Sequence, residues 1–280
     1  MTASARLVDA AGVRVNVVEW GRPERPPLLL LHGGMAHARW WDPVAALLAD
    51  RVHAFAVDMP GHGDSPWLDP EAYGARLEMA VIEALLAGLA PGPWALAGHS
   101  HGALLATLAV ARGAAAVDRL VLVDMPLDPT APRLVRSGAR FRRMPQPRFA
   151  TREQAVAAFR LFPGNGRAGP DVLRHVAEHS VRPDAAGGYT SKFDWRFFGG
   201  RAANEPSPYR EFGGLLAAVP CPTLVLRGEL STIQPAEDHA RLVRAIPRAS
   251  GMVIPDAGHN PHLENPAATA AAIAAFLRAG

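Results

Sequence analysis

Residues 94–102 read Trp-Ala-Leu-Ala-Gly-His-Ser-His-Gly, and an alanine- and leucine-rich run follows at residues 103–109. This stretch predicts a strand, a tight turn with Ser100 at its apex, and a helix. Gly98 and Gly102 give the spacing G-x-S-x-G of a nucleophile elbow. The turn strains the serine backbone, and a side chain at either glycine would collide with the neighbouring strand or helix. Such a turn holds the serine Oγ above the sheet at a helix N-terminus, which favours developing negative charge.

The composition is that of a protein with a sizeable core. The 280 residues are 49% hydrophobic and 20% charged, which suits one large α/β domain or two small ones. The net charge is +3, and Lys192 is the only lysine, so nearly all the positive charge is arginine. We attribute this bias to coding composition rather than to a nucleic-acid surface. An arginine-rich segment, residues 136–148, is interpreted as a solvated loop face, with attraction of an anionic substrate or a membrane surface as the alternative.

The cysteine content and the hydropathy pattern limit which cellular compartment and which partners we expect. Cys221 is the only cysteine, which excludes an intramolecular disulfide framework, and we expect it to be a buried structural thiol. No apolar stretch reaches the roughly 20 residues of a membrane span, and no signal-peptide pattern opens the chain. We therefore expect a cytoplasmic protein that takes a small-molecule substrate and binds no nucleic acid. The sequence leaves the choice between monomer and homodimer open.

Strand-like and helix-like segments alternate along most of the chain. Alternating residues at 6–9 and 12–20 predict a hairpin at a sheet edge. Buried strands are predicted at residues 26–31, 52–57, 119–123, 222–226 and 251–254, and helices at residues 40–50, 71–90, 235–246 and 261–279. This alternation indicates a parallel sheet covered by helices on both faces.

The alternation stops between residues 127 and 218. Proline- and arginine-rich loops and short helical patterns at residues 151–161, 170–180 and 209–218 fill this segment, and no clear strand appears in it. We therefore expect a core domain formed by residues 1–126 and 219–280. Residues 127–218 are expected to form a helical cap, or lid, over the carboxyl edge of the sheet.

Four motifs together resemble the α/β-hydrolase superfamily, in particular its capped single-domain type. They are His32-Gly33-Gly34, the loop Asp58-Met59-Pro60-Gly61-His62-Gly63-Asp64-Ser65, the serine turn, and Gly258-His259-Asn260-Pro261-His262-Leu263-Glu264-Asn265-Pro266. They occur in the family's order across essentially the whole chain. The resemblance implies the α/β-hydrolase fold: a mostly parallel twisted sheet flanked by helices, with a helical cap insertion. It also implies a serine esterase or lactonase that needs no cofactor.

Within this resemblance Ser100 is the expected nucleophile, with a helix N-cap as the alternative role. His259 is the expected general base, because it stands in a loop between an apolar strand and the last helix. His262 is the competing base, although we expect it to pack or cap within the helix. No metal is expected: Asp58 and Asp64 lie near His62, but the spacing fits no zinc or calcium signature, and in the family this loop is structural.

The acid of the triad departs from the usual pattern. The family usually places it after the strand corresponding to residues 222–226, where this chain reads Gly-Glu-Leu-Ser-Thr at 228–232, with Ser231 at the expected aspartate position. A minority of the superfamily, including one subgroup of haloalkane dehalogenases and the lactonases that open zearalenone, resembles a second solution with the acid one strand earlier. That position is Asp124, which we favour. Glu229 is the alternative acid, followed by Asp128 and Asp256, and Asp124 would otherwise be a turn residue.

The oxyanion hole should consist of backbone N–H groups, from His101 and from Gly34, with Met35 as a nearby alternative. The substrate pocket should lie between the sheet edge and the cap. Its candidate lining residues are Met35, Trp40, Trp41, Met125, Phe141, Met144, Phe159, Phe162, Phe193 and Trp195. These side chains favour a moderately apolar acyl or alcohol group, whereas the arginines at 140–143 favour a carboxylate, and the sequence leaves that choice open.

The favoured function is hydrolysis of a carboxylic ester or lactone through an acyl-enzyme intermediate. The same triad also serves C–C bond hydrolases, acyltransferases and perhydrolases, which the sequence does not separate. Epoxide hydrolysis and dehalogenation are disfavoured, because family members with those activities carry aspartate at the apex of the turn. A ligand-binding receptor on a hydrolase scaffold is the alternative from another class, motivated by Ser231; a carboxylate within hydrogen-bond reach of His259 Nδ1 counts against it.

Overall fold

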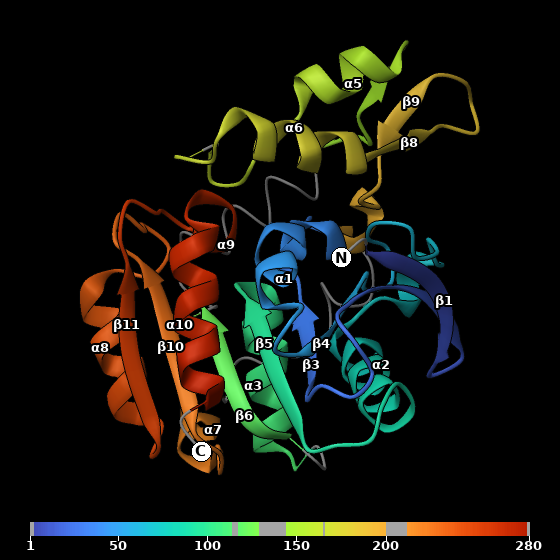
Figure 1. Ribbon diagram of the computed structural model, residues 1–280. Coiled ribbons are helices and arrows are strands. Elements are labelled where there is room, and N and C mark those ends of the chain that lie inside the picture. The colour runs from blue at the N-terminus through green and yellow to red at the C-terminus, as the bar shows by residue number, and fades with distance from the viewer. Residues whose placement is uncertain (1–2, 114–116, 129–143, 165, 200–211, 279–280) are drawn as a thin grey trace.

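A twisted sheet with helices on both faces forms the body of the protein (Figure 1). A computed structural model describes residues 3–113, 117–128, 144–164, 166–199 and 212–278. The strands of the main sheet are β1 (Ser4–Ala10), β2 (Val13–Trp20), β3 (Pro27–Leu31), β4 (His53–Val57), β5 (Trp94–His99), β6 (Val117–Val123), β10 (Thr223–Gly228) and β11 (Ala249–Ile254).

The order of strands in this sheet is β1-β2-β4-β3-β5-β6-β10-β11. β1 pairs with β2 and β2 with β4 in antiparallel fashion, and all pairs from β4 to β11 are parallel. The predicted parallel sheet and edge hairpin are therefore confirmed. Because the carboxyl ends of parallel strands meet at one edge, the loops after β3, β4, β5, β6 and β10 lie together there.

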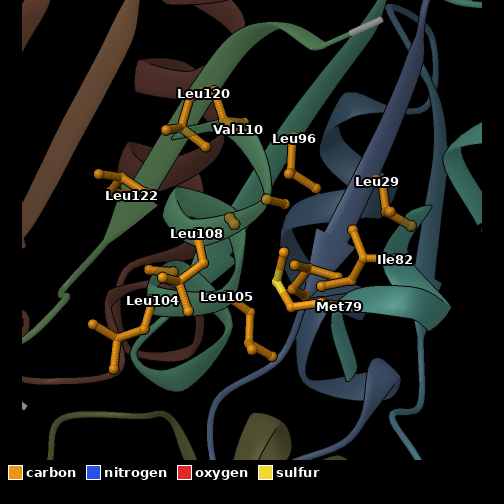
Figure 2. Close-up of a cluster of buried hydrophobic side chains, with 14 of the residues drawn as sticks. Leu29, Met79, Ile82, Leu96, Leu104, Leu105, Leu108, Val110, Leu120 and Leu122 are labelled. Carbon is orange, nitrogen blue, oxygen red and sulfur yellow. The ribbon is translucent and has the colours of Figure 1, made fainter. Parts of the chain in front are cut away.

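The helices of the core pack on both faces of the sheet and against one another. They are α1 (Asp42–Leu48), α2 (Ala75–Gly88), α3 (His101–Ala111), α7 (Phe212–Leu215), α8 (Ala236–Ala245), α9 (Pro261–Glu264) and α10 (Pro266–Arg278). One apolar cluster joins α2, α3 and α8 to one face of the sheet, and a second joins α1 and α10 to the other. Figure 2 shows part of the first cluster, in which Leu104, Leu105 and Leu108 of α3 lie among strand leucines and side chains of α2.

The predicted last helix is divided in two. Asn265 has φ −142° and ψ 70° and separates α9 from α10. The residue before a proline avoids the helical region, since the ring of Pro266 would clash with its backbone. The helix predicted from residue 71 likewise begins later, at Ala75, after a 3-10 turn at Pro70–Ala72 and Gly74 with φ 154°.

The segment between β6 and β10 is not purely helical, and the expectation that it holds no strand is wrong. Besides helices α5 (Arg152–Ala158) and α6 (Pro170–His179) it contains β7 (Arg148–Phe149), β8 (Val181–Pro183) and β9 (Tyr189–Ser191). These strands form a small antiparallel sheet in the order β7-β9-β8. They are too short for their alternation to be recognised in the sequence. In Figure 1 this layer lies beyond the carboxyl edge of the main sheet.

Asp194 connects this layer to the core. Its carboxylate is fully buried, accepts a hydrogen bond from the Tyr73 hydroxyl at 2.7 Å, and pairs with Arg196 at 2.8 Å. Its backbone N–H donates to the carbonyl of Gly61, in the loop after β4. Burial, together with the hydrogen bond to Asp194, raises the pKa of the Tyr73 hydroxyl. The layer is thus held to the loop after β4 by a buried polar cluster.

The carboxylate of Asp58 organises the loop after β4. It accepts hydrogen bonds from Asn16 Nδ2 at 2.8 Å, from the backbone N–H of Ala38 at 2.6 Å and from that of Asp64 at 2.8 Å. Burial raises the pKa of this carboxyl, although the hydrogen bonds oppose the shift. The three donors belong to β2, to the segment after β3 and to the loop after β4 itself, so Asp58 joins these segments and has a structural role here. Among the described residues, no helix is long and apolar enough to cross a membrane.

Asp58→Asn is expected to lower the free energy of unfolding by about 1–3 kcal/mol, because one carboxylate oxygen becomes an NH2 group that faces an N–H donor. Urea denaturation followed by circular dichroism measures the change. The control is Asp9→Asn, whose side chain is 84% exposed and whose effect should stay within about 0.5 kcal/mol. If the urea unfolding curve of Asp58→Asn coincides with that of wild type, the structural role of Asp58 is contradicted.

Candidate active site

The serine turn joins β5 to α3 with a strained residue at its apex. Ser100 has φ 51° and ψ −113°, between His99 at the end of β5 and His101 at the start of α3. A Cβ atom at Gly98 would overlap the backbone of Gly102, and one at Gly102 would lie 2.5 Å from the carbonyl oxygen of His32. Only glycine fits at both positions, because each contact is with backbone that cannot move aside. The glycine spacing therefore has the steric cause expected from the sequence.

The loop after β3 passes beside this turn. A Cβ at Gly33 would lie 2.7 Å from His99 Nδ1 and 3.4 Å from the Cβ of Ser100. His32 fixes the loop: the N–H of Met59 donates to its Nε2 at 3.1 Å, so Nδ1 carries the proton and donates to the Gly33 carbonyl at 2.7 Å. Burial lowers the pKa of His32 to about 4, which keeps the ring neutral. Gly34, the next residue, is exposed at the carboxyl edge of the sheet, and its neighbour Met35 is half-buried with φ 63°.

Ser100, His259 and Asp124 form one hydrogen-bonded chain. His259 Nε2 lies 3.1 Å from Ser100 Oγ, and His259 Nδ1 lies 2.8 Å from Asp124 Oδ1. A carboxylate only accepts hydrogen bonds, so Nδ1 carries the proton and Nε2 is left to accept the serine hydroxyl. The serine comes from the turn after β5, the aspartate from the end of β6, and the histidine from the loop between β11 and α9.

Asp124 is fully buried and accepts hydrogen bonds from three donors. Beside His259, the backbone N–H of Gly228 donates to Oδ2 at 2.9 Å, and the hydroxyl of Ser231 donates to Oδ1 at 2.6 Å. The N–H of Asp124 itself donates to Leu226 O at 2.8 Å. Its φ of 46° is a conformation that aspartate tolerates better than most residues. The carboxylate is thus held from both β6 and β10.

The other carboxylates considered as the acid make different contacts. Glu229 is exposed, and its Oε2 accepts a hydrogen bond from the N–H of Asp256 at 3.0 Å. The Asp256 side chain is 75% exposed and lies 3.4 Å from Arg167. Asp128 is exposed as well. Of these candidates, Asp124 is the one whose carboxylate is hydrogen-bonded to His259 in the described part of the chain.

Glu264 holds the backbone on both sides of His259. Its Oε2 accepts from the N–H of Gly258 at 2.8 Å, and its Oε1 accepts from the N–H of Asn260 at 3.0 Å. Oε2 also accepts from the N–H of Arg167, in the segment between β6 and β10. His99 Nε2 adds a 2.8 Å contact to the carbonyl oxygen of His259. The histidine loop is therefore fixed by side chains from α9 and β5.

A group of buried imidazoles surrounds the site. The His99 ring lies 4.7 Å from that of His259 and 4.4 Å from that of His262, and His262 packs 4.8 Å from Trp41. Burial lowers the pKa of His262 to about 3 and that of His99 well below the usual value, with neighbouring imidazoles acting in the same direction. Neither ring nitrogen of His262 has a hydrogen-bond partner among the described residues. His262 therefore packs as a neutral ring, away from the hydrogen-bonded chain.

His101 has a partner that the sequence did not indicate. Its Nε2 lies 3.0 Å from Oε1 of Glu78, a residue of α2 whose side chain is only 4% exposed. Burial opposes the imidazolium, but the charge of Glu78 and its hydrogen bond outweigh this effect and raise the pKa of His101. The ring is thus turned towards α2, while its backbone N–H begins α3 beside Ser100.

The proposed pocket residues fall into several environments. Trp40 is buried and meets Phe159 edge to face at 6.4 Å, in a cluster between the core and the segment after β6. Trp41 packs under α1, and Met125 is fully buried in the core. The backbone carbonyl of Phe162 accepts from the Asn260 side chain, one residue from His259.

The remaining pocket candidates lie further along the inserted segment. Phe193 is buried 4.7 Å from the ring of His62, and the indole N–H of Trp195 donates to Ser191. Met144 is exposed. Phe141 and the arginines at 140–143 lie outside the described residues. Of the candidates, Trp40, Trp41 and Phe162 are therefore joined by contacts to the region of His259, the two indoles through the ring of His262. Phe159 joins the group through Trp40.

Sequence reasoning missed the residues that support the triad. The sequence shows Ser231 only as a departure from the expected acid, and does not show that its hydroxyl donates to Asp124. It shows Glu264 as part of a motif, without its contact to the N–H of Gly258. The position of Glu264, six residues after Gly258, is a usable signal. At this spacing its carboxylate can reach back to backbone N–H groups of the histidine loop. No sequence signal indicated Glu78, which lies on another helix.

Comparison with known proteins places these features in a family. The model of the alpha/beta hydrolase family matches residues 28–272. An esterase of Mycobacterium tuberculosis is 28% identical over 261 residues, covering 91% of this chain and 83% of its own. A 2-hydroxy-6-oxo-6-(2'-aminophenyl)hexa-2,4-dienoic acid hydrolase of Metapseudomonas resinovorans is 26% identical, covering 97% and 90%. The crystal structure of an E-2-(acetamidomethylene)succinate hydrolase superposes with a TM-score of 0.82 at 27% identity, covering 99% of this chain and all of the other.

His262→Phe is expected to leave the protein at least as stable as wild type at pH 7, because an unpaired buried ring is replaced by an apolar one of similar shape. It should also reduce the loss of stability in acid. The unfolded chain takes up a proton near pH 6.5 and the native ring only near pH 3, so wild type loses stability as the pH falls through this interval. At pH 5 this proton uptake lowers the free energy of unfolding of wild type by about 2 kcal/mol, a loss that His262→Phe should not show.

Urea unfolding at pH 7 and pH 5 measures both effects. His262→Gln is the matched comparison: it also removes the titrating group, but it leaves a buried amide and should cost stability at pH 7. If His262→Phe and wild type lose equal stability between the two pH values, His262 is not held neutral in the native protein.

Proposed function

The chain belongs to the alpha/beta hydrolase family, and we propose that it is a serine hydrolase that cleaves a carboxylic ester or a lactone. The observation that carries the proposal is the hydrogen-bonded chain from Ser100 Oγ through His259 to Asp124, with distances of 3.1 and 2.8 Å. A base oriented by a buried carboxylate and aimed at a serine hydroxyl is the arrangement that makes serine a nucleophile at neutral pH.

In the first half of the reaction Ser100 Oγ attacks the substrate carbonyl carbon while its proton passes to His259 Nε2. The oxyanion that forms is held by the backbone N–H groups of Gly34 and His101. When the intermediate collapses, the C–O bond to the leaving group breaks, and His259 returns the proton to the departing alkoxide. An acyl-enzyme remains on Ser100, and a lactone leaves its alcohol attached to the same acyl chain.

In the second half, water replaces the alcohol and the same groups act again. His259 takes a proton from water, whose oxygen attacks the acyl carbon, and then returns the proton to Ser100 Oγ as the acid leaves. Asp124 stays ionised throughout, holds the Nδ1–H tautomer of His259 and stabilises the imidazolium. The chemistry needs no cofactor.

The segment from residue 127 to 218 is proposed as the cap that covers the substrate. The contacts of Trp40 with Phe159, and of Asn260 with the carbonyl of Phe162, support this, because they join the segment to the histidine loop. Aromatic side chains at this junction favour an apolar acyl or alcohol group of a small substrate. We also propose that the protein acts in the cytoplasm.

Hydrolysis of a C–C bond is the second candidate. The relative of Metapseudomonas resinovorans is named for a dienoic acid substrate, and this chain covers 90% of it. The same three residues would serve that reaction. Steady-state rates on a vinylogous keto-acid of that type and on p-nitrophenyl esters separate the two: the ester proposal expects the esters to be cleaved with the higher kcat/KM.

Asp124→Asn is expected to lower kcat on short-chain p-nitrophenyl esters by roughly 10³- to 10⁴-fold, since the amide would favour the wrong tautomer of His259. Ser100→Ala should abolish acyl-enzyme formation. Glu229→Gln is the matched control, because this carboxylate is exposed and accepts a hydrogen bond from the N–H of Asp256; its rates should equal those of wild type. Circular dichroism checks that each variant is folded.

Two outcomes contradict the proposal. Wild-type rates in a folded Asp124→Asn variant exclude Asp124 as the acid. Failure of wild type to release product from esters, together with no labelling of Ser100 by a fluorophosphonate, excludes the serine hydrolase itself.

A further inference from the structure

We propose that Ser231 is a positioning residue for the acid of the triad, whose hydroxyl keeps the Asp124 carboxylate turned towards His259. The inference rests on the proposed function and concerns the loop after β10. In the proteins that this chain resembles, this position usually carries the acid itself. Here it supplies a hydrogen-bond donor to an acid on the neighbouring strand.

The proton of the Ser231 hydroxyl has one destination. The backbone N–H groups of Ile233 and Gln234 both point at Oγ, at 3.3 and 3.1 Å. A hydroxyl has two lone pairs and one proton, so two incoming donors leave the proton for a third partner. That partner is Asp124 Oδ1, at 2.6 Å, a short distance typical of a hydroxyl that donates to a charged carboxylate.

The loop that carries Ser231 is fixed relative to β6. The side chain of Gln234 is fully buried, and its Nε2 donates to the carbonyl of Met125 at 2.9 Å, one residue after Asp124. Arg227 Nε donates to the carbonyl of Gln234 at 2.7 Å and closes the loop from the other side. Since both ends of the hydroxyl contact are anchored, its geometry is set by the fold rather than by a mobile side chain.

The hydroxyl shares one carboxylate oxygen with the histidine. Oδ1 of Asp124 accepts from both Ser231 and His259, while Oδ2 is held by the N–H of Gly228. Three donors fix the plane of the carboxylate. They also divide its charge, so that removal of the serine donor leaves more negative charge on Oδ1 for the imidazolium of His259.

A serine suits this position better than the usual aspartate would. A carboxylate at residue 231 would stand beside that of Asp124, and two such groups at hydrogen-bond distance cannot both ionise freely. With serine, the position satisfies the buried charge instead of opposing it. The departure from the family's pattern at Ser231 and the use of Asp124 are therefore two parts of one arrangement.

The test compares Ser231→Ala, which removes the hydroxyl, with Ser231→Thr, which keeps it. Ester hydrolysis is measured across pH. Loss of a hydrogen bond to a buried charge should lower kcat of Ser231→Ala roughly ten- to hundredfold. The acidic limb of its kcat/KM profile should move to higher pH, which a purely structural loss would not cause. Ser231→Thr should keep most of the wild-type rate and an unmoved profile.

Ser250→Ala, an exposed serine on β11, is the control and should match wild type throughout. A folded Ser231→Ala variant with wild-type kcat and an unshifted profile overturns the inference. The low-field proton resonance of His259 Nδ1 gives a readout that needs no activity: it should move in Ser231→Ala and stay in Ser231→Thr. An unmoved resonance in Ser231→Ala also overturns the inference.

The same series separates this inference from the proposed function. If wild type shows no Ser100-dependent ester cleavage, the proposed function fails, and the resonance alone decides the role of Ser231. If wild type cleaves esters and Ser231→Ala is indistinguishable from it, the proposed function stands and the role of Ser231 is refuted.

Discussion

The buried carboxylate of Asp124 holds together three segments that are far apart in the sequence. It accepts hydrogen bonds from the end of β10 and the loop that follows, through Gly228 and Ser231, and from the loop before α9, through His259. A fully buried charge costs several kcal/mol unless donors surround it. The three donors reach Asp124 only while β6, β10 and the histidine loop stay in register. The geometry at Ser100 depends on that register, because His259 reaches the serine only from this position.

Much of this arrangement is predictable from local patterns. Apolar runs ending in glycine-rich turns predict the parallel strands, and the alternation with helices predicts the layers, which the structure confirms. The turn at Ser100 is predictable because its sterics are local: Gly98 and Gly102 contact backbone within a few residues or on the adjacent strand. The position of Asp124 at the end of β6 follows from the same logic, since carboxyl ends of neighbouring parallel strands meet at one edge.

The features that sequence reasoning missed depend on contacts between distant segments. Strands β7, β8 and β9 have only two or three residues each, too few for a period of two to be detected. The last helix is divided because Asn265 stands before a proline. The continuous apolar pattern predicts a single helix there and does not take account of this local rule. The contact of Glu78 with His101 joins α2 to α3 and has no signature in spacing. The hydrogen bond from Ser231 to Asp124 is likewise invisible in the sequence, because Asp124 follows another strand.

The neutral imidazoles around His259 have a consequence for the reaction. In the proposed mechanism His259 becomes an imidazolium, with His99 only 4.7 Å away. A second positive charge at that distance would oppose the transition state by several kcal/mol at the low effective dielectric of a buried site. Burial removes this obstacle, since it lowers the pKa of His99 and His262 and keeps both rings uncharged at neutral pH. The cost appears in acid, where the unfolded chain takes up protons that the native chain refuses. Stability at low pH is thus exchanged for a site in which the rings of His99 and His262 stay uncharged beside the imidazolium that forms on His259.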